Sequence, residues 1–148
     1  MTKVFSYSTV LFLSLAGLTC KSTGNVASQK AMYRSIYFDQ FKLTYFRRFL
    51  LKSYNYSAAI QEIINRDHSG FTEPILSDAD DHLIDSLTTA DNELMKIDSA
   101  KGPLRAEGAQ GKRPFDYMLD KLNSKWLDSL ARKRAKAFDV PKEWLTSL

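Results

Sequence analysis

The chain has 148 residues, with 21 Lys and Arg, 17 Asp and Glu, two His and one Cys. This length fits one domain with at most a short targeting segment, and a composition of 44% hydrophobic and 26% charged residues excludes an intrinsically disordered chain. One cysteine excludes an internal disulfide, two histidines argue against a Cys/His zinc site, and a net charge of +4 is too mild to predict a nucleic-acid partner.

The first 19 residues differ from the rest of the chain. Lys3 is their only charged side chain, and the uncharged stretch that follows, 4–19, is mainly apolar. A basic start followed by an apolar run is the layout of a cleavable secretory signal. The run is shorter than the about 20 apolar residues of a membrane-spanning helix. A buried N-terminal helix of a soluble protein is the alternative interpretation.

Cys20 follows this stretch directly. Its position resembles that of the cysteine in a bacterial lipoprotein signal, which is lipid-modified and becomes the mature N-terminus. Gly stands three residues before it and Thr directly before it, where that family usually has Leu and then Gly or Ala. The resemblance implies a lipid anchor on Cys20 in the bacterial cell envelope. Secretion with cleavage near Ser22 or Gly24 stays open, and both alternatives place the mature protein outside the cytoplasm.

The expected organisation has three parts. Residues 1–19 are the signal segment, 20–28 carry the anchor cysteine and a small, polar, flexible tether, and 29–148 form a single helical domain.

The first helix is expected from about residue 28 to residue 53. Aromatic residues recur there at every fourth position and form one stripe. The stripe consists of Tyr33, Tyr37, Phe41, Tyr45 and Phe49. Basic residues fill the other positions, a mixture that can also bind single-stranded nucleic acid by stacking. Aromatic residues at helical spacing more often form a core, so we expect a buried helix and no nucleic-acid partner.

Two more helices are expected in the middle of the chain. Ser57 precedes a short helix over 58–65, and Ser77 precedes a helix that ends before the Lys-Gly-Pro stop at 101–103. The apolar residues of the longer helix alternate at spacings of four and three. They are Leu83, Leu87, Ala90, Leu94 and Ile97. This heptad spacing predicts packing along a second helix.

The last long helix is expected over 114–138, with Pro114 in its first turn. We expect Trp144, in the tail, to dock back on the body. The apolar face of this helix comprises Phe115, Leu119, Leu122, Trp126 and Leu130. No stretch alternates with the period of a strand. The predicted fold class is therefore all-α, a small bundle of three long helices plus one short helix after the signal segment.

Charge alternates along the mature chain. Residues 21–72 carry a net charge of +5, residues 73–101 carry −6, and residues 102–148 carry +4. We expect mutual neutralisation within one bundle, with the acidic helix running antiparallel to basic neighbours.

Residues 65–73 resemble the first half of an EF-hand calcium loop. Oxygen atoms fall at loop positions one, three, five, seven and nine, with Gly at position six. The implied ligands are Asn65, Asp67, Ser69, Phe71 and Glu73. A leucine stands at position twelve in place of the closing Glu. A helix end followed by a polar turn is the alternative interpretation.

The connection over 102–114 is long and holds three of the six glycines. Long ordered loops often carry binding function. The candidate contact residues are Arg105, Glu107, Lys112 and Arg113. The loop lacks the first Gly and the Ser or Thr of a phosphate-binding loop, so no nucleotide is expected. A plain connector is the alternative.

No catalytic set emerges, because the two histidines lie in polar segments and the carboxylate pairs are those of any charged helix. We therefore predict no enzyme activity and no cofactor other than the possible calcium ion. The leading hypothesis is an exported, lipid-anchored helical protein that acts as an envelope binding or scaffold module. The alternatives are an immunity-type or inhibitor protein that neutralises a toxin or hydrolase, and a calcium-binding module.

Overall fold

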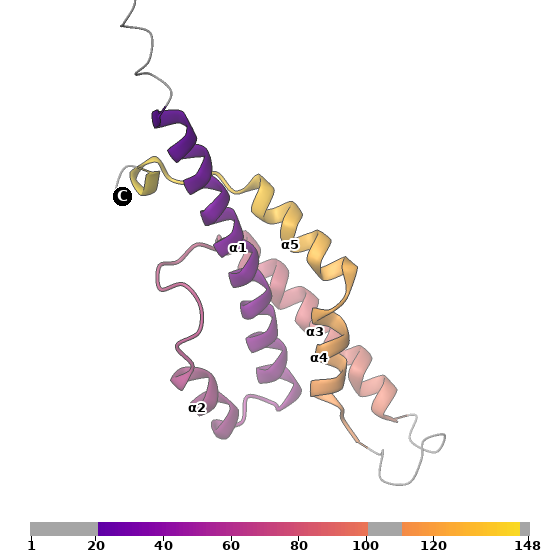
Figure 1. The fold of residues 1–148 in the computed structure, drawn as a ribbon. Helices are drawn as coiled ribbons and strands as arrows, with labels where there is room; N and C mark the ends of the chain where they lie inside the picture. Colours follow the sequence, from indigo (N-terminus) through magenta and orange to yellow (C-terminus); the bar gives the residue numbers. More distant parts are fainter. Residues whose placement is uncertain (1–20, 101–110, 146–148) are drawn as a thin grey trace, which may run out of the picture.

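The computed structural model describes residues 21–100 and 111–145. All of the regular structure in these residues is helical, and they contain no strand (Figure 1). The elements are α1 (Lys21–Ser53), α2 (Ala58–Arg66), α3 (Asp78–Ala100), α4 (Pro114–Leu122), α5 (Lys125–Ala137) and the 3-10 helix η2 (Lys142–Leu145). The all-α prediction is confirmed.

The predicted count of three long helices is wrong, because the helix expected over 114–138 is two helices. Asn123 and Ser124 separate α4 from α5. The Ser124 hydroxyl accepts a hydrogen bond from the Leu127 backbone N–H at 3.2 Å, which caps α5. Serine at an N-cap satisfies a backbone donor that a new helix leaves free. With this cap a new helix begins at Lys125. The single helix predicted over 114–138, and the apolar face predicted along it, therefore do not exist as one unit.

The first helix also begins earlier than expected. Helix α1 starts at Lys21, so the segment 21–28, predicted as part of a flexible tether, is helical. Cys20 lies outside the described residues.

Helices α1 and α3 run in the same direction, against the antiparallel prediction. Arg48 pairs with Asp81, and Lys52, one turn later, pairs with Asp85, so position increases along both helices together. The chain makes this possible by returning along α1 through α2 and the segment 67–77 (Figure 1). Helices α4 and α5 then run back antiparallel to both.

The aromatic stripe of α1 forms the centre of the core, as predicted. Phe41, Tyr45 and Phe49 are fully buried. Rings from the C-terminal part of the chain pack against the stripe along its length: Tyr33 against Trp144 at 5.2 Å, Tyr37 against Phe138 at 5.1 Å and Phe49 against Tyr117 at 5.4 Å between ring centroids. The expectation that Trp144 docks on the body is confirmed.

Across the two described segments, no helix combines the length and the apolar character that crossing a bilayer requires.

Candidate functional site

Helix α3 buries its polar side. Its buried residues are Asp80, Ile84, Thr88, Asp91, Asn92 and Met95. The stripe with heptad spacing, expected to pack along a second helix, is only partly covered: Leu94 and Ile97 are 55% and 56% exposed, and Leu83 and Leu87 are half-buried against the core. Among the described residues no helix covers Leu94 and Ile97, so packing of this half of the stripe along a second helix stays a prediction.

Asp80 fixes the first turn of α3 against α1 and α5. Its carboxylate accepts hydrogen bonds from Arg134 Nε at 2.6 Å and from the Ser77 hydroxyl at 2.6 Å, and it also interacts with the Tyr37 hydroxyl. Burial acts to raise the pKa of Asp80, but the bonds from Ser77, Tyr37 and Arg134 together hold this pKa below its ordinary value. A charged carboxylate thus remains at a buried position.

Asp91 makes the corresponding contacts three turns later. Its two oxygens accept from the Tyr45 hydroxyl and from the Tyr117 hydroxyl, the latter at 2.9 Å, and Lys121 Nζ lies 2.7 Å away. Burial, and then the bond to Asp91, raise the pKa of Tyr45 and of Tyr117 well above the usual value. Both phenols therefore stay protonated donors.

These two carboxylates determine which side of α3 faces outward. Each is buried and needs partners, because an unpaired charge in the interior is costly. Asp80 takes its partners from α1 and α5, and Asp91 takes its partners from α1 and α4. With both aspartates turned inward, Leu94 and Ile97 are turned toward solvent, and Leu87 is half-buried at the edge of the core.

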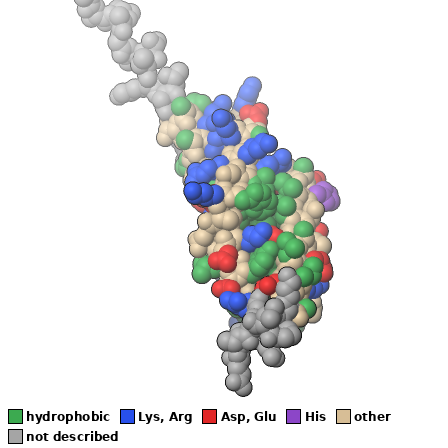
Figure 2. All heavy atoms as spheres, turned by 90° about the vertical axis from the view of Figure 1, so that its right-hand side faces the viewer, with side chains coloured by type: hydrophobic (Ala, Val, Ile, Leu, Met, Phe, Trp, Pro, Cys, Tyr) green, Lys and Arg blue, Asp and Glu red, His purple; other side chains and the backbone are tan. Residues whose placement is uncertain are grey.

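Helix α5 also carries apolar side chains at its surface, since Trp126 is 48% exposed and Leu130 is half-buried. The ion pair Asp80–Arg134 links α3 to α5, and the ion pair Asp91–Lys121 links α3 to α4, so α4 and α5 run antiparallel to α3. We call the apolar surface of α3 and α5 the outer apolar face. Its residues are Leu83, Leu87, Leu94, Ile97, Trp126 and Leu130. Figure 2 shows hydrophobic side chains gathered in the middle of this side of the molecule.

A shallow pocket lies beside Trp126 at the edge of this face. It has a volume of about 260 Å³ and is lined by Tyr117, Asp120, Lys121, Ser124 and Trp126. Lys121 Nζ lies 5.2 Å from the centre of the Trp126 ring, a cation–π contact.

Helix α4 also turns large apolar side chains outward. Phe115 and Leu119 are 64% and 59% exposed, although the sequence predicts them in the core. Met118 is buried instead, and Tyr117 stacks on Phe49. Because α4 ends before α5 begins, α4 can turn about its own axis independently of α5. Apolar residues spaced as in one continuous helix therefore do not share one face across α4 and α5.

The predicted contact loop is described only at its end. Arg105 and Glu107 lie outside the described residues. Lys112 donates to the Ser53 carbonyl at 3.1 Å, at the C-terminal end of α1, where a cation is favourable. Arg113 pairs with Asp116 at 2.5 Å. Both described members of the predicted set are thus bound within the chain.

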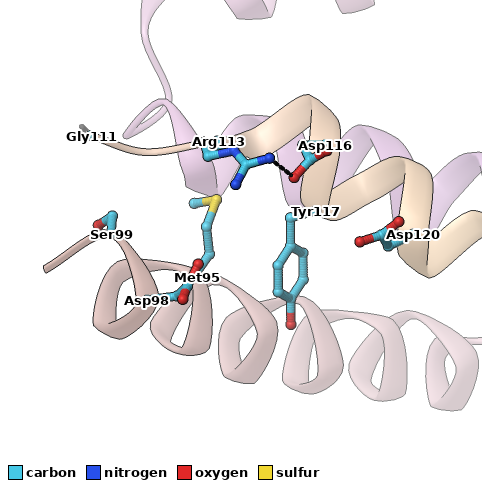
Figure 3. Close-up of a pocket in the computed structure, with 8 residues that line it drawn as sticks. All are labelled: Met95, Asp98, Ser99, Gly111, Arg113, Asp116, Tyr117 and Asp120. Carbon is cyan, nitrogen blue, oxygen red and sulfur yellow. Dashed lines mark ion pairs between the residues drawn. The ribbon is translucent and has the colours of Figure 1, made fainter. Parts of the chain in front are cut away.

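Arg113 borders a pocket of about 240 Å³ between α3 and α4 (Figure 3). Met95 and Tyr117 form its wall, and three carboxylates stand around it, from Asp98, Asp116 and Asp120. Within the part of the chain that the structure describes, no three or more His, Cys, Asp or Glu side chains are grouped as metal ligands would be.

The segment predicted to bind calcium contacts the side chain of Arg47, which belongs to α1. The Arg47 guanidinium donates to the Asp67 carboxylate at 2.7 Å and to the Ser69 carbonyl at 2.8 Å. The Ser69 hydroxyl donates to the same carboxylate at 2.6 Å. First the Ser69 bond and then the Arg47 bond hold the pKa of Asp67 well below its usual value. The Asp67 carboxylate, one of the expected calcium ligands, is therefore engaged by Arg47 and by the Ser69 hydroxyl.

The other predicted ligands are not gathered around this point. Asn65 belongs to α2, and Glu73 accepts from the neighbouring Thr72 hydroxyl at 3.2 Å. The Phe71 ring packs near Tyr33, at 6.3 Å between centroids. These residues form a polar turn beside α1, and calcium binding by them stays a prediction.

The buried aspartates of α3 were missed by sequence reasoning. A signal for them exists in α1, where three of the five stripe residues are tyrosines. Buried tyrosine hydroxyls require acceptors, and α3 is the acidic helix that supplies them.

Comparison of the chain with family models, with curated proteins and with solved structures gives no match.

Proposed function

We propose that this protein is an exported, lipid-anchored helical module of a bacterial envelope that acts by binding through its outer apolar face. The observation that carries the binding part is the orientation of α3, which buries Asp80 and Asp91 and exposes Leu94 and Ile97. A contiguous apolar patch on a soluble domain is costly to keep in water and marks an interaction site. The signal layout of residues 1–19 and the position of Cys20 support export and anchoring.

The shape of this face favours binding over catalysis. It is a long helical surface with one shallow hollow. The buried carboxylates beside it, Asp80 and Asp91, are engaged by hydrogen bonds and ion pairs within the fold. The immunity-type alternative stays a prediction, and a toxin or hydrolase gene beside this one is the observation that would favour it.

The anchor is tested by metabolic labelling with a fatty-acid analogue in a bacterial host. We expect label on the wild-type chain and none on Cys20→Ala. Equal label on the two chains, or none on either, would exclude the lipid anchor.

Binding is tested by placing a photo-crosslinking amino acid at Leu94 of the full chain in the same cells. The control carries it at Ile63, which is 64% exposed on α2, outside the outer apolar face. Discrete adducts at position 94 and not at position 63 are expected. Identical adduct patterns would contradict a specific binding face.

A further inference from the structure

We propose that a basic face formed by α1 and α5 binds the anionic headgroups of a phospholipid bilayer, so that both helices lie along the membrane surface. This inference rests on the lipid anchor of the proposed function, because it says which side of the anchored protein meets the membrane. The basic face consists of Lys30 and Arg34 of α1 and of Lys125, Arg132 and Lys136 of α5.

Two contacts place cations of α1 and α5 on one side of the molecule. Lys42 of α1 pairs with Asp128 of α5 at 2.5 Å, and one turn away the Arg132 guanidinium lies 4.7 Å from the centre of the Phe38 ring. Residue number falls along α1 as it rises along α5 between these two contacts. The two helices are therefore antiparallel, and these positions face each other.

The next turns of the two helices add the other cations. Arg34 lies four residues before the ring that Arg132 contacts, and Lys136 lies four residues after Arg132. Residues four apart are neighbours on the same side of a helix. Lys30 and Lys125 extend the two rows at similar spacing. Lys30 is half-buried and the other four cations are exposed.

The cations of the basic face differ from most other cations of the molecule. Within residues 21–100 and 111–145, no ion pair engages any of the five. Elsewhere, by comparison, Arg47 pairs with Asp67 and Lys52 pairs with Asp85. The positive charge of the basic face is thus not neutralised by ion pairs within the described fold.

The acidic groups at the same end of the molecule belong to other sides of it. Asp80 pairs with Arg134, which lies on the opposite side of α5 from Arg132, because two residues turn a helix by about 200°. Asp81 of α3 is engaged by Arg48. These two carboxylates therefore do not cancel the charge of the basic face.

Three further carboxylates are near this end of the chain. Asp139 lines the same pocket as Asp80 and Arg134, on the side of α5 away from the basic face. Asp78 is exposed on the opposite side of α3 from Asp80, by the same rotation. Asp39 is exposed on α1 beside the basic face, and five cations outweigh it. In Figure 2, Lys and Arg side chains accordingly gather in the upper part of the molecule.

The start of α1 brings this face to the membrane. Helix α1 begins at Lys21, so an acyl chain on Cys20 would hold the first turn of α1 at the bilayer. A helix rises about 1.5 Å per residue, so Arg34 lies about 20 Å along α1 from Lys21. Salt screens charges that are more than about 10 Å apart. An upright α1 would therefore lose the attraction, whereas an α1 that lies along the surface brings both rows of cations to the headgroups.

An anionic bilayer suits the shape and the charge of this face. The cations are spread along two adjacent helices, and each Lys or Arg near an anionic membrane adds to the attraction. A basic patch beside a lipid anchor strengthens membrane binding in this way. The orientation also leaves the outer apolar face accessible, because Leu130, two residues from Arg132, lies on the opposite side of α5.

The first experiment measures co-sedimentation of the full-length protein with two kinds of vesicle. One kind is phosphatidylcholine alone, and in the other about a third of the lipid is phosphatidylglycerol. We expect the wild type to bind the anionic vesicles about tenfold more tightly. This preference should disappear in about 1 M salt, where charges are screened within about 3 Å. Equal binding of the wild type to both kinds of vesicle would overturn the inference.

Charge reversal locates the binding surface. Lys125→Glu combined with Lys136→Glu, at two exposed lysines, should abolish the preference for anionic vesicles. The matched control is Arg66→Glu combined with Lys96→Glu, which changes the net charge equally on α2 and α3 and should keep most of the preference. If the first variant keeps its preference, or if both variants lose it equally, the basic face is not the membrane-binding surface.

Photo-crosslinking to lipid tests the orientation. Ser129 is exposed on α5, four residues after Lys125 and three before Arg132. A photo-reactive amino acid at this position should crosslink to radiolabelled phospholipid in the membranes of the host, and the same amino acid at Ile63 of α2 should not. Absence of lipid adducts at position 129, or equal adducts at both positions, would contradict an α5 that lies on the membrane.

The failure of this inference and the failure of the anchor give different results. The preference for anionic vesicles depends on the basic face and should persist in Cys20→Ala. Absence of fatty-acid label together with this preference would exclude the anchor and leave the basic face as a membrane-binding surface. Fatty-acid label without the preference would leave the anchor and exclude the role of the basic face.

Discussion

Helices α1 and α3 are the two longest helices in the described part of the chain, and they bury opposite kinds of side chain. Helix α1 buries an aromatic stripe in which Phe41, Tyr45 and Phe49 are inaccessible to solvent. Helix α3 buries Asp80 and Asp91 and leaves Leu94 and Ile97 outside. The difference shows that an apolar stripe does not by itself decide which side of a helix faces the core. Here the buried tyrosines of α1 need acceptors, and their acceptors orient α3.

The largest effect is expected from α1. Phe41→Ala should lower the free energy of unfolding by about 3–5 kcal/mol, because it removes a fully buried ring and leaves a cavity. Phe115→Ala, at an exposed ring of α4, is the control and should cost less than about 1 kcal/mol. Urea denaturation followed by circular dichroism measures both. Similar losses for the two variants would contradict the described core.

The second prediction is that, within α3, replacing a polar residue lowers the free energy of unfolding more than replacing a leucine. Asp91→Ala should destabilise the fold by about 3 kcal/mol, because it leaves two phenol hydroxyls and Lys121 without their acceptor. Leu94→Ala should cost less than about 1 kcal/mol, because this side chain is 55% exposed. Denaturation at low protein concentration compares them. A larger loss for Leu94→Ala would mean that α3 faces the other way.

The third prediction concerns acid. The pKa of Asp80 is held below the unfolded value of 3.8, so the folded state favours the carboxylate. Its stabilisation is present above that value and is lost as the pH falls through the lower pKa of the folded state, because the unfolded chain then binds more protons. Asp85 and Asp128, whose pKa values are also lowered, add to this slope. Thermal melting should therefore shift downward on acidification below about pH 4.

Asp80→Asn tests this directly. The variant should be less stable at neutral pH and should show a shallower loss of melting temperature in acid than the wild type. The matched control is Asp120→Asn, which removes an exposed carboxylate. An unchanged acid slope in Asp80→Asn would show that Asp80 is not a source of the pH dependence.

The smallest expected effect lies in the turn that was first interpreted as a calcium loop. Gly70 has a φ of +104°, and a side chain there would press on the Gln40 amide and on Leu43. Gly70→Ala should cost about 1–2 kcal/mol, from backbone strain and from this contact. Gly111→Ala has a similar φ of +100° but open surroundings, so it isolates the strain and should cost about 1 kcal/mol. Urea midpoints that rank Gly111→Ala as the more harmful would contradict the close approach of this turn to α1.

The sequence predicts the helical class and the buried stripe of α1, because a repeated aromatic pattern over five turns depends on local geometry alone. It does not predict the orientation of α3, since that depends on Tyr37 and Tyr45, which lie more than forty residues away along the chain. The separation of α4 from α5 depends on one serine cap, and the pattern of apolar residues continues across it. The candidate calcium ligands match the spacing of the first half of an EF-hand loop. The ion pair between Asp67 and Arg47 joins residues 20 positions apart, so a motif within the loop cannot predict it.

The packing of Tyr33 against Trp144 has a consequence for how the protein is made. The two residues are 111 positions apart, and the aromatic stripe of α1 is completed at Tyr37 and Phe49 by side chains that are also translated long after it. While the nascent chain elongates, α1 therefore emerges from the ribosome with its aromatic rings uncovered. The complete core can therefore close only after residues 117–144 have been made. An open chain is the state in which a translocation channel accepts a polypeptide, so late closure and the export proposed for this protein are compatible.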